Sequence, residues 1–207
     1  MNLDRIATLL RPHVALSRAQ LESVSMYIDM LQKWNARINL TAVSDPEAMV
    51  TRHFGESFFV AARVLSPPPV DVIDVGSGAG FPGLPMAIFE GRAQIMLIEA
   101  NTKKAAFLGE VIGALKLRNA RVFCGRAEDY SRRAALVTMR AVEKFEKALP
   151  VALSLVDRGG RIALMVGRSQ EGSAQRLAPG FQWEQSVSLP GSEARVLLVG
   201  TKLVKVE

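Results

Sequence analysis

The sequence predicts an α/β protein in which a mostly parallel, doubly wound sheet follows a helical N-terminal extension. Three observations lead to this fold class. From residue 70 onward, short apolar runs recur at a spacing of roughly 20 to 30 residues, with helical patterns between them. A glycine-rich turn follows the first run, and the last two runs are joined by only a short polar turn. Before residue 66, the apolar residues instead recur with a helical period.

Length and composition are those of one domain with a smaller appendage. The chain has 207 residues, and 49% of them are hydrophobic, which is enough to bury a core. We therefore expect an ordered protein with two parts, a helical extension over residues 1–66 and a sheet domain over residues 67–207.

Several classes of protein are excluded by what the sequence lacks. It has no run of 18 apolar residues and no secretory signal at its start, so we expect a soluble cytoplasmic protein without a membrane partner. Cys124 is the only cysteine, which excludes an internal disulfide, and we expect it to be buried as a small hydrophobe. Because His13, His53 and Cys124 are dispersed along the chain, no metal site is predicted.

The charge balance leaves two interpretations open. The net charge is +6, and the isoelectric point is about 9.8, a range in which a phosphate-rich partner becomes plausible. A basic surface without any nucleic-acid role explains the same numbers equally well.

The N-terminal extension is predicted to contain three helices. The first, LDRIATLL, is short and ends before a proline. The second carries a helical apolar stripe in SRAQLESVSMYIDMLQKWNARINL, opened by a capping box between Ser17 and Gln20. The third begins at Asp45, with Pro46 in its first turn. Trp34 lies on the well-filled stripe of the second helix, which favours an intramolecular contact and a monomer.

The sheet domain is predicted to contain seven strands. The segment SPPPV at residues 66–70 forms a stiff connector to it. Five apolar runs predict the parallel strands: VDVIDV, AQIMLIEA, ARVFCGRA, AALVTMRA and GRIALMVG. The segments FQWEQSVSLP and RVLLVGTKLV predict two long strands that form an antiparallel hairpin at the sheet edge.

The turn DVGSGAGFPGLP after the first strand is the predicted ligand site. Ligands of an open α/β sheet sit beyond the carboxyl ends of the strands, where the winding reverses. Gly76, Gly78 and Gly80 let the backbone approach a ligand closely, and Pro82 sets the start of the next helix. The spacing of Gly78, Gly80 and Gly83 also matches the dinucleotide fingerprint, which on its own is a weak signal.

Two carboxylates favour S-adenosylmethionine over NAD as the ligand of this turn. Asp74 precedes the glycines, where it would repel a pyrophosphate and attract an amino group or a sulfonium. Glu99 ends the second strand, where it can accept hydrogen bonds from both ribose hydroxyls of an adenosine. Ala127 and Glu128 follow the third strand and would reach the adenine side of the cleft. NAD shares the adenosine ribose and stays an alternative.

If the chain transfers a methyl group, the sequence favours a ring nitrogen as acceptor. Methylation of a pyrimidine carbon needs a cysteine nucleophile, and Cys124 lies away from the fourth strand, where the acceptor should dock. The polar-Pro-Pro-aromatic turn typical of exocyclic-amine methylation is absent from LVTMRAVEKF. Guanine N7 has a free lone pair and needs no general base, so catalysis would be mostly alignment.

Arg140 ends the fourth strand and would point into the same cleft. An arginine there can bind the cofactor loop or pair bidentately with the acceptor edge of guanine. A structural salt bridge is the alternative.

Five segments carry a family resemblance that covers nearly the whole chain. They are LQKWNARINLTAVSDPEAMVTRHFGES, DVGSGAGFPGLP, LIEANTKKAAFL, GRAED and MRA, in this order and spacing. The chain resembles the bacterial small-subunit rRNA guanine-N7 methyltransferases, the RsmG family, formerly called GidB. The combination of segments is far more specific than the glycine turn alone.

The resemblance implies a fold, a reaction and a set of site residues. The fold would be that of a class I S-adenosylmethionine-dependent methyltransferase, Rossmann-like, with an N-terminal helical extension. The methyl donor would be S-adenosylmethionine, and the acceptor a guanine of 16S rRNA in the conserved loop near the decoding centre. Positions that match the family's cofactor contacts are Gly76, Phe81, Ala127, Glu128 and Arg140, and Glu99 matches the acid of the second strand. The segment TRHFGES would place its polar residues at the mouth of the cleft facing the substrate: Arg52, His53, Glu56 and Ser57.

Two departures from the family pattern limit what can be carried over. Glu56 stands where the family has an aspartate, which keeps the charge and lengthens the side chain by one methylene. Val166 stands where many relatives have a lysine after the fifth strand, and Arg168 is nearby. A substrate-contacting lysine is therefore not carried over to this chain.

Two other classes of function remain open from the residues alone: an NAD-dependent Rossmann-type enzyme, and a non-catalytic RNA-binding module. The expected partner is 16S rRNA or the small ribosomal subunit, and no metal is implied.

Overall fold

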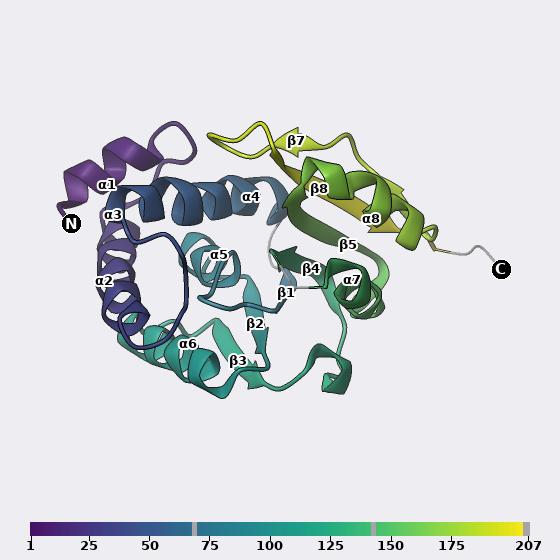
Figure 1. The fold of residues 1–207 in the computed structure, drawn as a ribbon, viewed down its shortest axis with the longest axis horizontal. Helices are drawn as coiled ribbons and strands as arrows, with labels where there is room; N and C mark the ends of the chain where they lie inside the picture. Colours follow the sequence, from purple (N-terminus) through teal and green to yellow (C-terminus); the bar gives the residue numbers. More distant parts are fainter. Residues whose placement is uncertain (68–69, 142–143, 205–207) are drawn as a thin grey trace.

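The computed structural model describes residues 1–67, 70–141 and 144–204 and contains one mixed sheet with helices on both faces (Figure 1). The strands lie in the order β3-β2-β1-β4-β5-β8-β6, and β7 pairs with β8 beside this path. The strands are β1 (Asp71–Val75), β2 (Gln94–Glu99), β3 (Ala120–Cys124), β4 (Ala134–Arg140), β5 (Val156–Gly167), β6 (Phe181–Trp183), β7 (Val187–Ser188) and β8 (Arg195–Lys202).

Strand direction confirms the predicted winding. β1 pairs in parallel with both β2 and β4, β2 with β3, and β4 with β5, whereas β8 runs antiparallel to β5. The chain therefore moves outward from β1 in one direction, returns, and continues from β4 in the other. A crevice opens at the carboxyl ends of β1 and β4, where this reversal occurs.

Figure 1 shows the helices in two groups. The N-terminal helices lie with α5 and α6 on one side, and α7 and α8 lie on the other. The helices are α1 (Leu3–Leu10), α2 (Arg18–Asn35), α3 (Pro46–Ala48), the π-helix η1 (Met49–Gly55), α4 (Glu56–Val64), α5 (Gly83–Phe89), α6 (Thr102–Ala114), α7 (Phe145–Ser154) and α8 (Glu171–Leu177), with short 3₁₀ turns η2 (Ala127–Asp129) and η3 (Arg168–Gln170).

The predicted start of α2 is confirmed. The Ser17 side chain accepts from the Gln20 backbone, and the Gln20 side chain accepts from the Ser17 backbone, which completes the capping box. The Gln20 amide also donates to the carbonyls of Ile88 and Phe89 at the end of α5. The cap therefore joins the N-terminal extension to the sheet domain.

The predicted third helix is present but is not a regular α-helix. Asp45 caps it through the backbone of Ala48, as expected, but the seven residues that follow, Met49–Gly55, form a π-helix before α4 begins. The π-helix buries Met49, Val50 and Phe54, whereas His53 is half-buried and Arg52 is exposed. π-Helical turns of this kind are frequent at functional sites.

The C-terminal hairpin differs from the prediction in one respect. Its first half is two short strands, β6 and β7, which both pair with β8, so the sheet has eight strands instead of seven. Trp183 of β6 pairs with Gly200 of β8, and its ring packs where a Gly200 side chain would be, 2.7 Å from a built Cβ. The chain then leaves the β8 ladder before it pairs again at Val187.

The N-terminal extension shares a core with the sheet. Tyr27 of α2 is fully buried, stacks on Phe81 at 5.4 Å between ring centroids, and packs edge-on against Phe54. Trp34 makes the predicted intramolecular contact, since its Nε1 donates to Glu110 at 3.0 Å and its ring packs on Phe107. The boundary between residues 66 and 67 stays a prediction, and residues 68–69 of the predicted connector lie outside the described residues.

Two further observations concern the described part of the chain. Within residues 1–67, 70–141 and 144–204, we find no helix long and apolar enough to cross a bilayer. Cys124 is exposed, so the expectation of a buried cysteine is wrong. It is the last residue of β3, which is the edge strand of the sheet.

Candidate functional site

The glycine turn follows β1 at the crevice, in a conformation that requires glycine. Gly76, Gly78 and Gly80 have φ of 67°, 56° and 92°, in the left-handed region that favours residues without a side chain. At Gly80 an added Cβ would lie 2.3 Å from the Tyr27 hydroxyl and 2.6 Å from a methyl of Leu84. The Tyr27 hydroxyl also donates to the carbonyl of Ala79. The N-terminal extension thus holds the turn from behind.

Asp74, on the strand before the turn, binds the backbone at the end of the turn. It is 1% exposed, and its carboxylate accepts from the Thr138 hydroxyl at 2.7 Å and from the Gly83 backbone at 3.3 Å. Burial raises the pKa of Asp74 to about 6, against the lowering effect of these hydrogen bonds. Its carboxylate faces the inside of the turn, so any attraction for a cationic ligand must act across the turn.

Glu99 faces the crevice and has free acceptor capacity. One carboxylate oxygen accepts from the Gly78 backbone and the other from the Asn101 backbone, each at 2.8 Å. A carboxylate oxygen accepts two hydrogen bonds, so each keeps a lone pair for a ligand hydroxyl. This is the arrangement that a ribose with two adjacent hydroxyls requires.

His53 of the π-helix is fixed on three sides. Its ring stacks on Phe81 with 4.9 Å between centroids, and Nε2 lies 2.7 Å from the Thr41 hydroxyl. Nδ1 lies 3.4 Å from the Arg140 guanidinium, which can only donate, so the hydrogen of the neutral ring belongs on Nε2. Burial, which is the largest cause, and the charges of Arg140, Arg52 and Arg195 together lower the pKa of His53 to about 3. His53 is therefore neutral near pH 7.

Arg140 and Glu56 form the centre of a buried charge cluster. An Arg140 nitrogen lies 2.9 Å from one Glu56 oxygen and 3.0 Å from the carbonyl of Arg52. An Arg195 nitrogen lies 2.7 Å from the other Glu56 oxygen and forms an ion pair with it. The angles of this contact are not those of a hydrogen bond. Only 1% of the Glu56 side chain is exposed, compared with 12% for Arg140 and 30% for Arg195. One carboxylate therefore gathers two guanidinium groups, with Arg52 exposed beside them.

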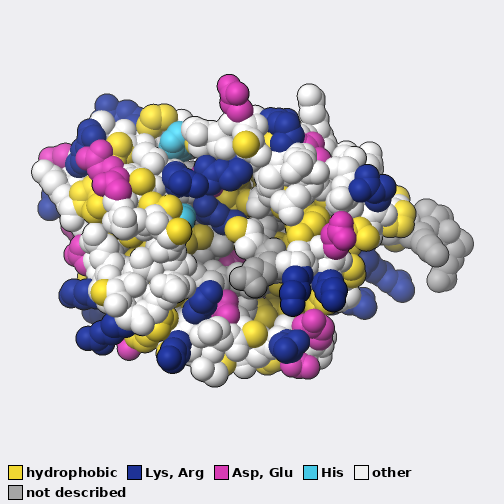
Figure 2. All heavy atoms as spheres, in the orientation of Figure 1, with side chains coloured by type: hydrophobic (Ala, Val, Ile, Leu, Met, Phe, Trp, Pro, Cys, Tyr) yellow, Lys and Arg dark blue, Asp and Glu magenta, His cyan; other side chains and the backbone are white. Residues whose placement is uncertain are grey.

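These groups surround one cavity of about 400 Å³. The described residues that line it are Leu40, Thr41, His53, Gly76, Ser77, Gly78, Ala79, Phe81, Glu99, Lys104, Arg140 and Ala141. Figure 2 shows Lys and Arg side chains gathered above a hollow near the middle of this face. The cavity has a glycine-turn end with a carboxylate and an opposite end with a histidine and a guanidinium.

The structure brings together most of the residues that the sequence pointed to. His53, Gly76, Gly78, Phe81, Glu99 and Arg140 line the cavity. Asp74 and Gly80 lie behind the turn. Glu56 and Ser57 are buried behind Arg140, 1% and 0% exposed, so the expectation that they face the substrate at the mouth of the cleft is wrong. Ala127 and Glu128 sit on the turn η2 after β3 and do not line the cavity, although Glu128 is exposed.

Four contributors were not assigned from the sequence. Thr41 and Leu40 belong to the quoted segment INLTA, and Asn35 holds them through hydrogen bonds of its side-chain amide to Leu40 and Thr41. Lys104 lies in the quoted segment NTKK. For Leu40, Thr41 and Lys104, the family resemblance of these segments indicated importance but assigned no role to the residue. Arg195 had no local signal, because only the pairing of β8 with β5 brings it to Glu56.

Neither Val166 nor Arg168 is among the described residues that line the cavity. Val166 is 6% exposed and belongs to the core on the α7 side of the sheet. Arg168 donates to the carbonyl of Glu193 and to Ser188, and it lies 3.6 Å from Glu171. It is engaged with the β7–β8 turn and does not line the cavity.

The arrangement suits positioning better than acid–base chemistry. The one histidine in the cavity is neutral, with its basic nitrogen turned toward Arg140. Within the described residues there is no group of three or more His, Cys, Asp or Glu side chains that could hold a metal ion.

Comparison with known sequences identifies close relatives. The GidB family, described as rRNA small subunit methyltransferase G, matches residues 20–194. "Ribosomal RNA small subunit methyltransferase G" of Chloroflexus aggregans is 38% identical over 203 residues, which cover 92% of this chain and 85% of the relative. The protein of the same name from Neisseria meningitidis serogroup A is 36% identical over 182 residues, covering 86% and 87%.

Comparison with solved structures agrees on the fold. Magnesium protoporphyrin IX methyltransferase from Synechocystis PCC 6803 with bound SAM superposes with a TM-score of 0.66, over 91% of this chain and 99% of that one, at 14% identity. A SAM-dependent methyltransferase from Aquifex aeolicus gives 0.63, over 87% and 98%, also at 14% identity. The fold is that of class I SAM-dependent methyltransferases, as predicted.

Proposed function

Because this chain belongs to the rRNA small subunit methyltransferase G family, we propose that it transfers a methyl group from S-adenosylmethionine to guanine N7 of 16S rRNA, in the conserved loop near the decoding centre. Ribosomal RNA, naked or in the small subunit, is the partner, and the cytoplasm is where it is found. We infer that the protein acts as a monomer, since Trp34 is used within the chain.

One observation carries the proposal: a single cavity joins a ribose-binding carboxylate to a cationic end. The two ends differ in charge, as is expected of a site that binds a cationic methyl donor at one end and an anionic RNA acceptor at the other. An NAD-dependent enzyme would need to seat a pyrophosphate at the glycine turn, directly above the buried charge of Asp74. A non-catalytic RNA-binding module would not need the turn at all.

At the donor end, Glu99 would accept the ribose hydroxyls, and the backbone of Gly76 and Gly78 would approach the methionine part. Phe81 forms the wall between this end and His53. Asp74 adds negative charge behind the turn, which favours a cationic ligand. Ala127 and Glu128 are kept as candidates for the adenine side, because η2 follows the end of β3.

At the acceptor end, the residues would orient the guanine. When bound, S-adenosylmethionine supplies an electrophilic methyl, and the N7 lone pair forms the new bond as the bond to sulfur breaks and its electrons stay on sulfur. N7 carries no proton, so no base is needed. Arg140 and Arg52 can bind the acceptor edge of guanine or its phosphate, and His53 and Glu56 hold Arg140 in place.

The direct test is the transfer of labelled methyl from S-adenosylmethionine to small subunits and to naked 16S rRNA, followed by mapping of the modified base. We expect label at one guanine N7. Arg52→Ala and His53→Ala should lose methylation while they still bind S-adenosylhomocysteine in a calorimeter. Label on a pyrimidine or on an exocyclic amine would refute the assignment of the acceptor, and unchanged rates in both variants would remove these residues from the site.

A thermal-shift assay separates the donor alternatives. S-adenosylhomocysteine should raise the melting temperature, because a ligand of the native state stabilises it by mass action. NADH at the same concentration should not. A shift with NADH alone would favour the dehydrogenase alternative.

A further inference from the structure

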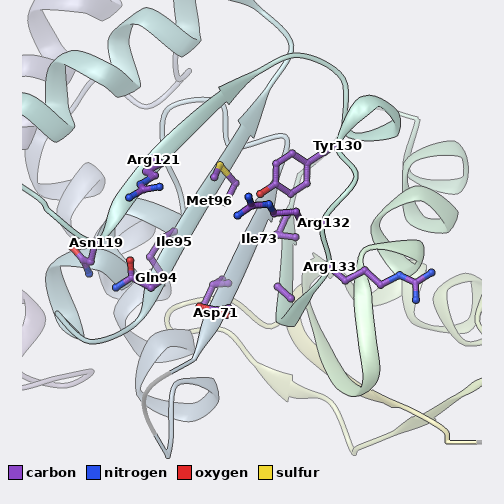
Figure 3. A pocket seen from close by; sticks show the side chains of 12 residues that line it. Asp71, Ile73, Gln94, Ile95, Met96, Asn119, Arg121, Tyr130, Arg132 and Arg133 are labelled. Carbon is purple, nitrogen blue, oxygen red and sulfur yellow. The ribbon is translucent and has the colours of Figure 1, made fainter.

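A second hollow lies at the amino-terminal end of the strands, away from the cofactor cavity (Figure 3). Helices connect β1 to β2, β2 to β3 and β4 to β5, but the connection from β3 to β4 contains only the short turn η2. One face of β2 and β3 therefore has no helix over it. The hollow left there has a volume of about 250 Å³.

The floor of the hollow is a row of side chains across three strands. Ile73 of β1 is in register with Met96 of β2, which is in register with Arg121 of β3. Register partners in a parallel sheet point to the same face. Met96 is only half-buried, and Tyr130 covers the next row by packing edge-on against Phe123 at 5.0 Å. An aromatic ring thus stands beside a floor in which Met96 is partly open to solvent and Ile73 lies beneath, 2% exposed.

The rim of the hollow is basic. Figure 3 shows the Arg121 and Arg132 guanidinium groups and the Tyr130 ring over the same part of the sheet, whereas Arg133 points away from it. Arg133 also lines an adjoining hollow of about 650 Å³. Together the described linings of the two hollows hold five arginines and two aspartates: Arg121, Arg132, Arg133, Arg158 and Arg161, with Asp71 and Asp157. No ion pair with an acid is found for Arg121 or Arg132 among the described residues.

We propose that this hollow is a second RNA-binding site, which takes one unpaired base of the substrate RNA onto Met96 beside Tyr130, with the flanking phosphates on Arg121 and Arg132. The inference rests on the proposed function, since it assumes that RNA is the substrate. Single-stranded RNA is recognised by bases stacked on aromatic rings and by guanidinium contacts to phosphate, and both groups are present here. A hollow of this size is below the range for a whole cofactor and fits one base.

The position of the hollow sets the kind of RNA that can use it. The hollow and the cofactor cavity lie at opposite ends of β1, which has 5 residues. At a rise of about 3.3 Å per residue, the two sites are roughly 15 Å apart. An RNA that reaches both sites must therefore extend along the protein. Long rRNA can do so, whereas a short hairpin that carries only the target guanine cannot. The site should act on affinity for long RNA and leave the chemistry unchanged.

The test is a charge reversal at the rim. Arg121→Glu with Arg132→Glu should weaken binding of 16S rRNA by tenfold or more at ~0.15 M salt and reduce the slope of log affinity against log salt by about 1.4. Raised KM with unchanged kcat should follow in methyl transfer. Arg18→Glu with Arg176→Glu is the matched control, because both arginines are exposed and line neither hollow. Affinity for S-adenosylhomocysteine should stay at the wild-type value in all variants.

Two further measurements keep the proposal testable if the reversed variant is unstable. Arg121→Gln with Arg132→Gln removes charge without adding repulsion, and it should reduce the salt slope by the same amount. Thiouridine-substituted 16S rRNA should crosslink to Tyr130 or its neighbours in wild-type protein. Wild-type salt slopes in both variants, or crosslinks confined to the cofactor cavity, would overturn the proposal. Specific binding of GMP in the hollow without any effect on RNA affinity would also overturn it. Failure of wild-type protein to methylate rRNA would instead contradict the proposed function.

Discussion

Half-buried His53 and buried Asp74 are both ionisable, and their contributions to stability respond to pH in opposite directions. Burial raises the pKa of Asp74 to about 6, so its buried charge lowers the unfolding free energy above pH 6. This destabilisation disappears as the pH falls toward 4, because the carboxylate is then protonated. The pKa of His53 is lowered to about 3 in the folded chain. Between pH 6.5 and pH 3, His53 is therefore protonated in the unfolded chain and neutral in the folded chain. Stability due to His53 is therefore lost as the pH falls from 6.5 toward 3.

This difference predicts the behaviour of His53→Gln. Between pH 8 and pH 5, wild-type protein should lose about 2 kcal/mol of unfolding free energy relative to the variant, because 1.5 pH units below the unfolded pKa cost about 1.36 kcal/mol each. The Asp74 contribution is common to both proteins and cancels. Urea unfolding at the two pH values measures the difference, and parallel pH profiles would show that His53 is not held neutral.

The Glu56 carboxylate compensates the positive charges of two neighbouring arginines, Arg140 and Arg195. Burial raises the pKa of Glu56, and Arg140, Arg195 and Arg52 oppose this by lowering it. Glu56→Gln would leave Arg140 and Arg195 facing each other with less compensation. We expect a loss of up to about 3 kcal/mol in unfolding free energy and a fall in methylation of more than tenfold. Glu56→Asp is the control, since it retains the charge and shortens the side chain by one methylene.

The Glu56 control also separates charge from packing. If the charge is what matters, the aspartate variant keeps most of the activity in the methyl-transfer assay. Equal losses in both variants would show that the length of the side chain, and not its charge, holds Arg140.

At the scale of one element, the glycine turn separates ligand binding from folding. Gly78 lines the cavity, and an added Cβ meets nothing nearer than 3.8 Å. Gly78→Val should abolish binding of S-adenosylhomocysteine in a calorimeter and cost only about 1–2 kcal/mol of stability, because a branched side chain is strained at φ of 56°. Retained micromolar affinity would refute the assignment of the turn.

Gly80→Ala provides the comparison within the same turn. Its Cβ would meet the Tyr27 hydroxyl at 2.3 Å and Leu84 at 2.6 Å, both behind the turn. We expect a larger loss of stability than in Gly78→Val, about 3 kcal/mol or more, since the overlap is with packed side chains. Urea unfolding of both variants gives the order, and the reverse order would mean that the packing behind Gly80 relaxes easily.

At the scale of the whole molecule, the N-terminal extension is part of the core. Tyr27, Phe54 and Phe58 are fully buried and belong to the same hydrophobic cluster as Leu84 and Phe107 of the sheet domain. A chain that begins at residue 67 would expose this face of α5 and α6. We expect it to show no cooperative urea transition and to bind a hydrophobic dye. A sharp transition in the shortened chain would establish the sheet domain as independent.

Local signals explain how much of the fold could be predicted. The capping box at Ser17, the cap at Asp45 and the period of the strands depend on neighbours within a few residues, so their energies are visible in the sequence. The glycine turn and Glu99 follow from the ends of two predicted strands. The π-helix and the division of the first hairpin strand into β6 and β7 were not predicted, because no period of apolar residues in the sequence marks either of them.

The sequence by itself determined the fold class, the glycine turn, the polar residues around it and, through family likeness, the reaction. Only the tertiary structure decided how these groups are used. Thr138 and Gly83 turn Asp74 inward, the pairing of β8 with β5 brings Arg195 to Glu56, and the missing helix between β3 and β4 leaves Arg121 on an open face. Periodicity and caps are set by near neighbours, whereas burial, ion pairing and pKa depend on residues that meet only when the chain has folded.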